Sequence, residues 1–297
     1  MKKKTLLLLM AIALAAGSAW AGESVDVTKS ASASPSVDIE NLAGSVRITG
    51  WDRNEIKVTG VLGDDTDGLD FSGSGDSFDI EVEIPDSYGR RHRDLDSELE
   101  IWLPAGSSVS VETVSASIRV SEVNGQLELE SVSGEVTVDG SPTSADVETV
   151  SGHIEVSGSQ TRIIAESVSG TIELSGVAER VEAATVSGAI KVEASNIEHG
   201  EFEAVSGSVH FTGALSPGAR LSAESHSGGV VLSLPADTSA RFQIETFSGS
   251  IDNGFGGGEA ERSSRYAPGK KLDFTLGSGD AQVRIESFSG SVTLKRL

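Results

Sequence analysis

The sequence predicts an all-β fold, a single-domain parallel β-solenoid with rungs of about 18 residues. Two observations predict it: a Val-Ser-Gly-like turn recurs along the chain, and apolar residues alternate with polar ones on both sides of each turn. A composition rich in glycine, with only 5% aromatic residues, favours short strands and tight turns over helices. Each rung is expected to hold two short strands, with extra strands capping the N-terminal end.

The turn is the most regular element of the repeat. Its serine recurs at Ser115, Ser133, Ser151, Ser169, Ser187, Ser206, Ser227, Ser248 and Ser289, and the first five copies are spaced by 18 residues. An earlier, divergent copy is Leu42-Ala43-Gly44. Glycine follows the serine except at Ala116, which indicates a corner with a positive φ or a close backbone approach. We expect the serines to bond to backbone, because a nucleophile needs a base and no histidine column accompanies them.

Strands are predicted on both sides of the turn. After it, apolar residues fall two and four positions beyond the glycine, as at Val136 and Val138. Before it, a second alternation occurs, as at Leu127 and Leu129. A period of two places alternate side chains on opposite faces of a strand, so each strand turns one apolar face inward. Rungs of this kind stack in parallel at about 4.8 Å.

The two ends of the chain and three insertions depart from the repeat. Lys2 to Lys4, an apolar run and Ala19-Trp20-Ala21 predict a signal peptide over residues 1–21. We expect a polar lead-in over 22–36 and the solenoid over 37–297, with insertions at 61–77, 85–97 and 253–271. The protein is therefore expected to be exported, periplasmic or extracellular, without a transmembrane segment after cleavage. With no cysteine in the chain, it is not expected to be a lipoprotein.

Charge narrows the classes of partner. The formal net charge is −22, and it becomes −25 if the three lysines of the signal peptide are removed. So acidic a chain repels polyanions, which argues against nucleic acid and anionic lipid as partners. The histidines fall in unrelated contexts without the pairing that metal or catalytic motifs need. No catalytic, cofactor-binding or metal-binding residues are predicted.

A column of glutamates is the sharpest candidate for a functional surface. It lies two residues before the turn valine, with outward parity, and is broken only by Ala184. Its members are Glu40, Glu112, Glu130, Glu148, Glu166, Glu203, Glu224, Glu245 and Glu286. Four residues before the column stand Arg162, Arg180, Arg220 and Arg241, with His199 in the same register. Mutual charge compensation across a solvated sheet is the favoured interpretation. Weak divalent cation binding is the alternative, because rows of carboxylate oxygens suit Ca²⁺ or Mg²⁺.

A second candidate surface is the loop that contains Arg90, Arg91 and Arg93. It is the only dense basic cluster after the signal peptide. It is interpreted either as a contact loop for an anionic envelope polymer or as an ordinary solvated loop.

The residues also resemble a known family. The run from Val37 to Asp52 with Glu55-Ile56-Lys57-Val58, and Leu103-Pro104-Ala105-Gly106 and Leu234-Pro235-Ala236 before later turns, resemble the bacterial "putative adhesin" domain of unknown function. The resemblance covers nearly the whole chain after residue 36. It implies a β-solenoid of exported or envelope proteins, for which adhesion has been proposed, and it brings no catalytic residues.

The favoured function is a non-enzymatic, exported envelope module for binding or structure, with an adhesin-like role. Its partner is expected to be an envelope protein or a glycan, and self-association is a further option. One alternative is a β-helix enzyme that acts on polysaccharide, although the rungs are short and no carboxylate pair outside the repeat stands out. Another is an element of the envelope that responds to cations.

Overall fold

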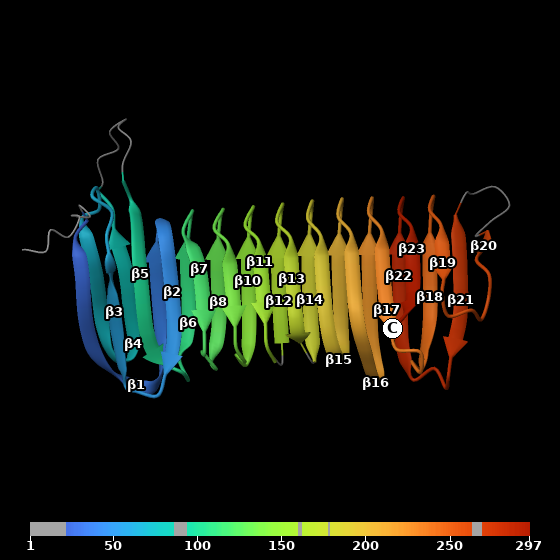
Figure 1. Ribbon diagram of the computed structural model, residues 1–297, viewed down its shortest axis with the longest axis horizontal. Coiled ribbons are helices and arrows are strands. Elements are labelled where there is room, and N and C mark those ends of the chain that lie inside the picture. The colour runs from blue at the N-terminus through green and yellow to red at the C-terminus, as the bar shows by residue number, and fades with distance from the viewer. Residues whose placement is uncertain (1–21, 86–93, 160–161, 178, 263–268) are drawn as a thin grey trace, which may run out of the picture.

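The computed structural model describes residues 22–85, 94–159, 162–177, 179–262 and 269–297. All the regular structure in these ranges is β, and the 23 strands form one continuous hydrogen-bonded sheet that folds back on itself to make a rod (Figure 1). The predicted parallel β-solenoid is confirmed. Among the described residues there is no helix that is long and apolar enough to cross a membrane.

One long side of the rod, here called the glutamate face, is built from strands that precede the Val-Ser-Gly turns. In spatial order these strands are β4 (Gly68–Glu83), β1 (Ser24–Asn41), β6 (Ser108–Thr113), β8 (Gln126–Ser131), β10 (Ser144–Thr149), β12 (Arg162–Ser167), β14 (Arg180–Thr185), β15 (Ile190–Ala204), β16 (Val209–Ser225), β22 (Ala281–Ser287), β18 (Ala240–Thr246), β21 (Lys270–Leu276) and β20 (Glu261–Arg262). All pair in parallel except the last two, β21 and β20, which pair antiparallel.

The opposite face is built mainly from strands that follow the turns. From the N-terminal end these strands are the first part of β1, β3 (Glu55–Val61), β5 (Asp96–Pro104), β2 (Ala43–Trp51), β7 (Ser117–Ser121), β9 (Val136–Asp139), β11 (Ile154–Ser157), β13 (Ile172–Val177), the first parts of β15 and β16, β17 (Val230–Leu234), β23 (Val292–Arg296) and β19 (Ile251–Asn253). The long strands β1, β15 and β16 run through both faces, so each rung has its two predicted strands even where no break separates them.

Strand order departs from chain order at both ends of the rod. Near the N-terminus, β1 pairs with both β4 and β6, and β2 pairs with both β5 and β7. The first rung therefore lies between two later rungs, the one of β4 and β5 and the one of β6 and β7. Near the C-terminus, β22 lies between β16 and β18, and β23 lies between β17 and β19. The C-terminus accordingly lies inward of β18, β19 and β21 in Figure 1. Antiparallel strands cap both ends, the first part of β1 with β3 at the N-terminal end and β21 with β20 at the C-terminal end, whereas the sequence predicted a cap only at the N-terminal one.

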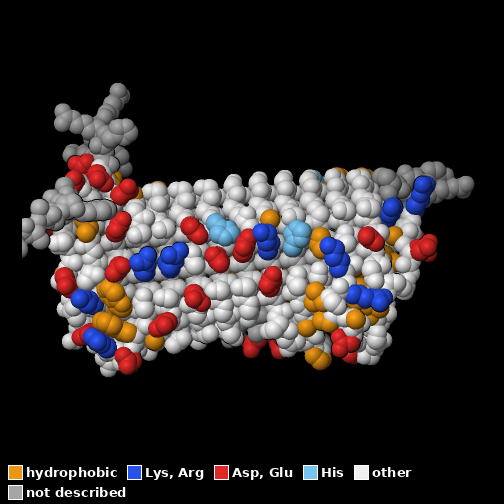
Figure 2. All heavy atoms as spheres, viewed as in Figure 1, with side chains coloured by type: hydrophobic (Ala, Val, Ile, Leu, Met, Phe, Trp, Pro, Cys, Tyr) orange, Lys and Arg blue, Asp and Glu red, His pale blue; other side chains and the backbone are white. Residues whose placement is uncertain are grey.

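The core is a stack of aliphatic side chains between the two faces. In three central rungs it consists of Leu129, Val147 and Ala165 from the glutamate face and Val138, Val156 and Leu174 from the opposite face, each at most 2% exposed. Like residues stack on like because the register between rungs is in phase. Figure 2 shows the result from outside: charged and polar side chains run along the middle of the visible face, and hydrophobic ones gather near its ends.

The turn needs glycine because the backbones of successive rungs approach closely there. A Cβ placed on Gly152 would lie 1.9 Å from the carbonyl oxygen of Gly134 in the rung before it, so a side chain there would separate the rungs. Gly152 is not among the residues with positive φ, which decides between the two predicted reasons. The turn serines bond to backbone as predicted: Ser133 donates from its N–H to the Val114 carbonyl at 2.8 Å and from its Oγ at 3.1 Å.

Several predicted segment boundaries shift. Residues 22–36 were expected to be a polar lead-in, but residues 24–36 belong to β1, and residues 24–30 pair antiparallel with β3. The insertion 61–77 includes the start of β4, and 253–271 contains β20 and the start of β21. Pairing with a neighbour satisfies backbone groups however polar the side chains are, which is why composition alone missed these strands. The predicted signal peptide and the Arg90, Arg91 and Arg93 loop lie outside the described residues.

Candidate binding groove

The predicted glutamate column is a continuous ladder on the glutamate face. Parallel pairing in register places its members side by side in the order Glu81, Glu40, Glu112, Glu130, Glu148, Glu166, Ala184, Glu203, Glu224, Glu286 and Glu245. At its C-terminal end the ladder meets Lys271, whose Nζ lies 2.9 Å from Glu245 Oε1. Glu81 joins the predicted residues, and Ala184 is the one gap, as the sequence indicates.

The ladder carries electrostatic strain. Desolvation raises the pKa of Glu130 above its ordinary value, and the carboxylates of Glu148 and Glu112 raise it further. The pKa of Glu148 is raised in the same way, by desolvation and then by Glu166, and that of Glu40 by desolvation and then by Glu81. Like charges stacked about 4.8 Å apart repel by about 0.9 kcal/mol per pair in water before screening. The folded chain therefore holds these carboxylates close together at a cost.

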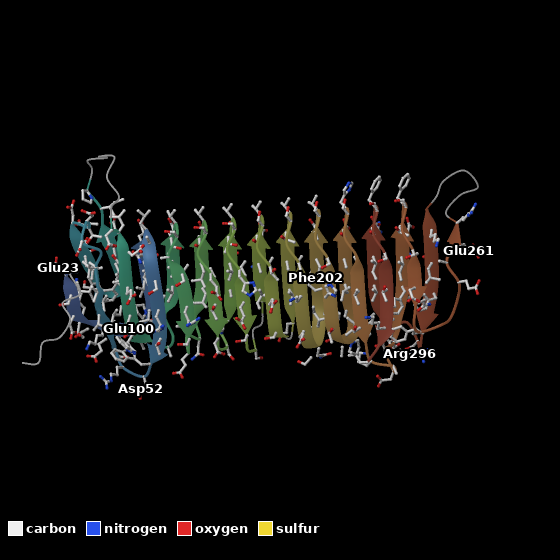
Figure 3. The ribbon with its side chains drawn as sticks, turned by 45° about the horizontal axis from the view of Figure 1, so that its top comes forward. Glu23, Asp52, Glu100, Phe202, Glu261 and Arg296 are labelled. Atoms are coloured by element: carbon white, nitrogen blue, oxygen red, sulfur yellow. The ribbon has the colours of Figure 1, made fainter. Side chains whose placement is uncertain are left out.

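Beside the ladder runs a ridge of exposed apolar side chains from the turns. Backbone hydrogen bonds between successive turns stack its members in the order Leu42, Val114, Val132, Val150, Val168, Val186, Val205, His226, Phe288 and Phe247. The valines are 45–48% exposed, and the two phenylalanines are 48% and 49% exposed. Figure 3 shows these side chains as a row along the upper edge of the rod. We call this row the turn ridge.

The turn ridge changes from aliphatic to aromatic toward the C-terminal end. The ring of Phe288 stacks on His226 at 4.7 Å between centroids and on Phe247 at 4.8 Å, with planes within 5° of parallel. The spacing of the rings matches the strand spacing, so each ring covers the face of the next. His226 thus continues the ridge as a flat ring.

Between the ladder and the turn ridge lies a floor of buried hydroxyl side chains. Ser131 accepts a hydrogen bond from the Gly134 N–H at 2.8 Å, and Thr113 bonds to the Ser131 hydroxyl at 2.9 Å. The pattern recurs at Ser167 with Gly170, at 2.8 Å. These bonds tie each turn to the strand before it, so the spacing between ladder and ridge is fixed.

Ladder, floor and ridge together line one long groove. Its volume is about 1000 Å³, and it extends from Glu81 and Ile84 at the N-terminal end to Glu286 and Phe288 near the C-terminal end. The ten strands it crosses, spaced by about 4.8 Å, make it about 43 Å long. The arrangement suits an extended partner that meets carboxylates on one wall and apolar side chains on the other.

Comparison with known proteins gives the family. The model of the family described as Toastrack DUF4097 matches residues 21–213 and 175–295. The chain belongs to the Toastrack family. The resemblance seen in the sequence is confirmed, and the repeated Toastrack rung is the unit that builds the groove. No curated protein matches the chain.

Solved structures that resemble the Toastrack chain do so distantly. The "putative adhesin" of Bacteroides fragilis is 12% identical, with 93% of this chain and 97% of that chain covered and a TM-score of 0.47. The "putative cell adhesion protein" of Clostridium sporogenes is 9% identical, with 93% and 100% covered and a TM-score of 0.25. The "putative adhesin" of Parabacteroides distasonis is 8% identical, with 92% and 97% covered and a TM-score of 0.34. Function is therefore argued from the groove itself.

The predicted arginines lie on the same face of the Toastrack rod but away from the ladder. Arg162, Arg180, His199 and Arg220 form a row four residues along the strands from the glutamates. Within the described ranges, no ion pair joins Arg162, Arg180, Arg220 or Arg241 to the ladder; its ion pairs there come from Lys271 and Arg284. Among the same residues, no group of three or more acidic or histidine side chains could hold a metal ion.

Sequence reasoning missed the turn ridge. The turn valine served only to define the repeat, and its exposure was not predicted. The signal was present, because Val132 stands two positions after Glu130 and so shares its outward parity. An apolar residue that repeats at an outward position in every rung indicates a surface that a partner covers.

Proposed function

We propose that this protein is an exported, non-enzymatic binding module that holds an extended, cationic and amphipathic segment of another envelope protein in its groove. This is an adhesin-like role in which one surface grips a partner along its length. Export rests on the signal peptide expected from residues 1–21.

The observation that carries the proposal is the turn ridge beside the ladder. Its six valines and two phenylalanines are each 45–49% exposed, and together with His226 they form a stacked surface larger than isolated exposed residues make. Covering that surface is favourable by roughly 25 cal/mol per Å² of apolar area removed from water. A partner that covers it must also lie against the glutamates, which selects for cationic groups.

Repulsion between the glutamates is a second argument for a cationic partner. Burial and then the neighbouring carboxylates raise the pKa of Glu130 and of Glu148, so lysine or arginine side chains alongside them would relieve repulsion as well as add attraction.

The repeat favours binding over catalysis. The same chemistry recurs in each rung, so many weak contacts add along an extended partner without any single deep pocket. The turn serines are engaged with backbone carbonyls, as at Ser115, Ser133 and Ser151, and do not adjoin a base there.

The test is a titration by fluorescence anisotropy with two labelled peptides of about 14 residues, long enough to span the groove when extended. One alternates Lys with Leu and the other alternates Lys with Ser. We expect the Lys-Leu peptide to bind about tenfold more tightly, since only it covers the turn ridge, which corresponds to about 1.4 kcal/mol. The triple variant Glu130→Gln/Glu148→Gln/Glu166→Gln should weaken both peptides. The variant Val132→Ser/Val150→Ser/Val168→Ser should weaken only the Lys-Leu peptide.

The matched control is Glu135→Gln/Glu155→Gln/Glu193→Gln, which removes the same charge from exposed positions off the glutamate face. If the control weakens binding as much as the ladder variant does, attraction is a property of net charge and the groove proposal fails. Equal affinity for the two peptides would show that the turn ridge does not contribute to binding. Binding of a neutral polysaccharide in the groove, with no peptide binding, would replace the proposed partner by a glycan.

A further inference from the structure

A second hollow lies on the glutamate face, away from the groove. It has a volume of about 550 Å³ and is lined by three arginines, Arg220, Arg241 and Arg284, together with Gln243, Gln282 and Ser222 among others. We propose that this hollow, here called the arginine basin, binds a single anionic group, a carboxylate, sulfate or phosphate, carried by a partner of low charge density.

The strand register brings the three arginines together. Arg220 on β16 and Arg241 on β18 both pair with Gln282 on β22, which lies between them. Arg284 projects from the same strand as Gln282, two residues further along, and its neighbours across the sheet are Ser222 and Gln243. Three arginines on adjacent strands therefore line one hollow, and the two Gln amides add further hydrogen-bond donors.

The charges in the arginine basin are incompletely balanced by the protein. Arg284 bonds to Glu286 Oε1. Arg220 and Arg241 have no ion-pair partner within the described part of the chain, although its net charge is strongly negative. The Arg241 side chain packs closely against Gly279: a Cβ on Gly279 would lie only 2.9 Å from Arg241 Cγ. Arginines that are held together by strand pairing and left unpaired point to an anion from outside.

The surroundings limit which anions fit. Glu201 lines the same hollow, and Glu224 and Glu286 stand on the neighbouring ladder. A dense polyanion such as nucleic acid would meet these carboxylates as well as the arginines and would be repelled. One planar carboxylate or tetrahedral oxyanion can take paired N–H donors from a guanidinium without reaching the ladder.

The test follows the arginine Nε–Hε resonances of the ¹⁵N-labelled protein by NMR at constant ionic strength. The probes are inorganic sulfate, inorganic phosphate and glucuronic acid, so the result separates tetrahedral oxyanions from a sugar carboxylate. We expect saturable shifts at Arg220, Arg241 and Arg284 with at least one probe. The variant Arg220→Gln/Arg241→Gln should weaken that binding at least tenfold while the peptide titration of the groove stays unchanged.

The control is Arg162→Gln/Arg180→Gln, which removes two neighbouring arginines from the same row without a third beside them. Binding that falls equally in both variants would show a general ionic effect and overturn the proposal, as would the absence of any saturable shift. A different result would overturn it too: concentration-dependent self-association that is lost in Arg220→Gln/Arg241→Gln, with no response to anions, would assign the arginines to a second copy of this chain. Unchanged melting temperatures exclude misfolding as the cause of lost binding.

Discussion

The two halves of the glutamate face have the same fold and opposite surfaces. On residues 77–83 of β4, residues 36–41 of β1, and on β6, β8 and β10, all described, the outward positions carry no basic side chain, and their acids are Asp79, Glu81, Glu83, Asp38, Glu40, Glu112, Glu128, Glu130, Asp146 and Glu148. On β12, β14, β16, β22 and β18 each strand presents one arginine, and β15 presents His199. We call these the acidic half and the arginine half.

The halves also differ inside. The central rungs of the acidic half are packed with aliphatic side chains, whereas the arginine half has the stacked rings of Phe202 and Phe211, 5.8 Å apart, and of Phe242 and Phe274, 4.6 Å apart. Inward and outward positions alternate along a strand, so the core and the surface of a rung vary independently. The repeat therefore fixes a scaffold on which the ladder, the turn ridge and the arginine basin are separate additions.

The largest effect is expected from the core of the arginine half. Phe202→Ala should lower the free energy of unfolding by about 3–5 kcal/mol, because a fully buried ring is replaced by a cavity beside Phe211. Leu129→Ala at the equivalent position of the acidic half should cost less, about 2–3 kcal/mol, since fewer buried atoms are removed. Denaturant unfolding of the two variants measures both values. Equal losses would contradict the inferred difference between the two cores.

Closing the gap in the ladder tests its repulsion. Ala184→Glu places a carboxylate between Glu166 and Glu203. Two new repulsive pairs should destabilise the protein by about 1 kcal/mol at pH 7.5, or about 2–4 °C in melting temperature. Ala184→Gln is the control of the same shape without the charge. If the two variants melt at the same temperature at pH 7.5, the ladder carries no significant strain.

Removing one carboxylate should stabilise the protein, whereas adding one destabilises it. Glu148→Gln should stabilise the protein at pH 7.5 by up to about 1 kcal/mol, because Glu148 has the ladder neighbours Glu130 and Glu166. Glu203→Gln should stabilise it by less, because Glu203 lies between Ala184 and Glu224 and has one such neighbour. Thermal melts of both variants at pH 7.5 measure the difference.

The pH dependence of Glu148→Gln follows from its raised pKa. A carboxyl whose pKa is raised by folding holds its proton more firmly in the folded state. Its contribution to stability is full below the unfolded pKa and is lost as the pH rises through the folded pKa. The gain from Glu148→Gln should therefore shrink between pH 7.5 and pH 4. A gain that grows on acidification would show that the carboxylate is stabilised by folding.

The smallest effect is expected at the end of the ladder. Lys271→Met removes the bond to Glu245, which lies on the surface, so the melting temperature should fall by less than about 2 °C at low salt and by nothing measurable at 0.5 M NaCl. The hydrogen bonds that Lys271 donates to Glu245 and Asp273 raise its pKa, so the pair is intact at neutral pH. Lys295→Met is the control at an exposed position. A loss that persists in high salt would indicate packing instead of charge.

Much of this protein was determined by its sequence alone, because a repeat turns local preference into global order. The spacing of the turn serines, the glycine beside them and the period of two were sufficient for the rung, its two strands, the core positions and the outward glutamates. The same parity argument, applied to Val132 and its equivalents, would have found the turn ridge as well.

Only the tertiary structure decided how the ends of the rod are built. Which rung lies beside which depends on pairing between strands far apart in the chain, and short-range patterns carry no information about that. The insertion of β22 between β16 and β18 places Gln282 between Arg220 and Arg241, with Arg284 two residues further along the same strand, so the arginine basin exists only in three dimensions. Whether a charged residue has a partner is decided in the same way: four residues along a strand separates two side chains by about 13 Å, too far for the predicted arginines to neutralise the ladder.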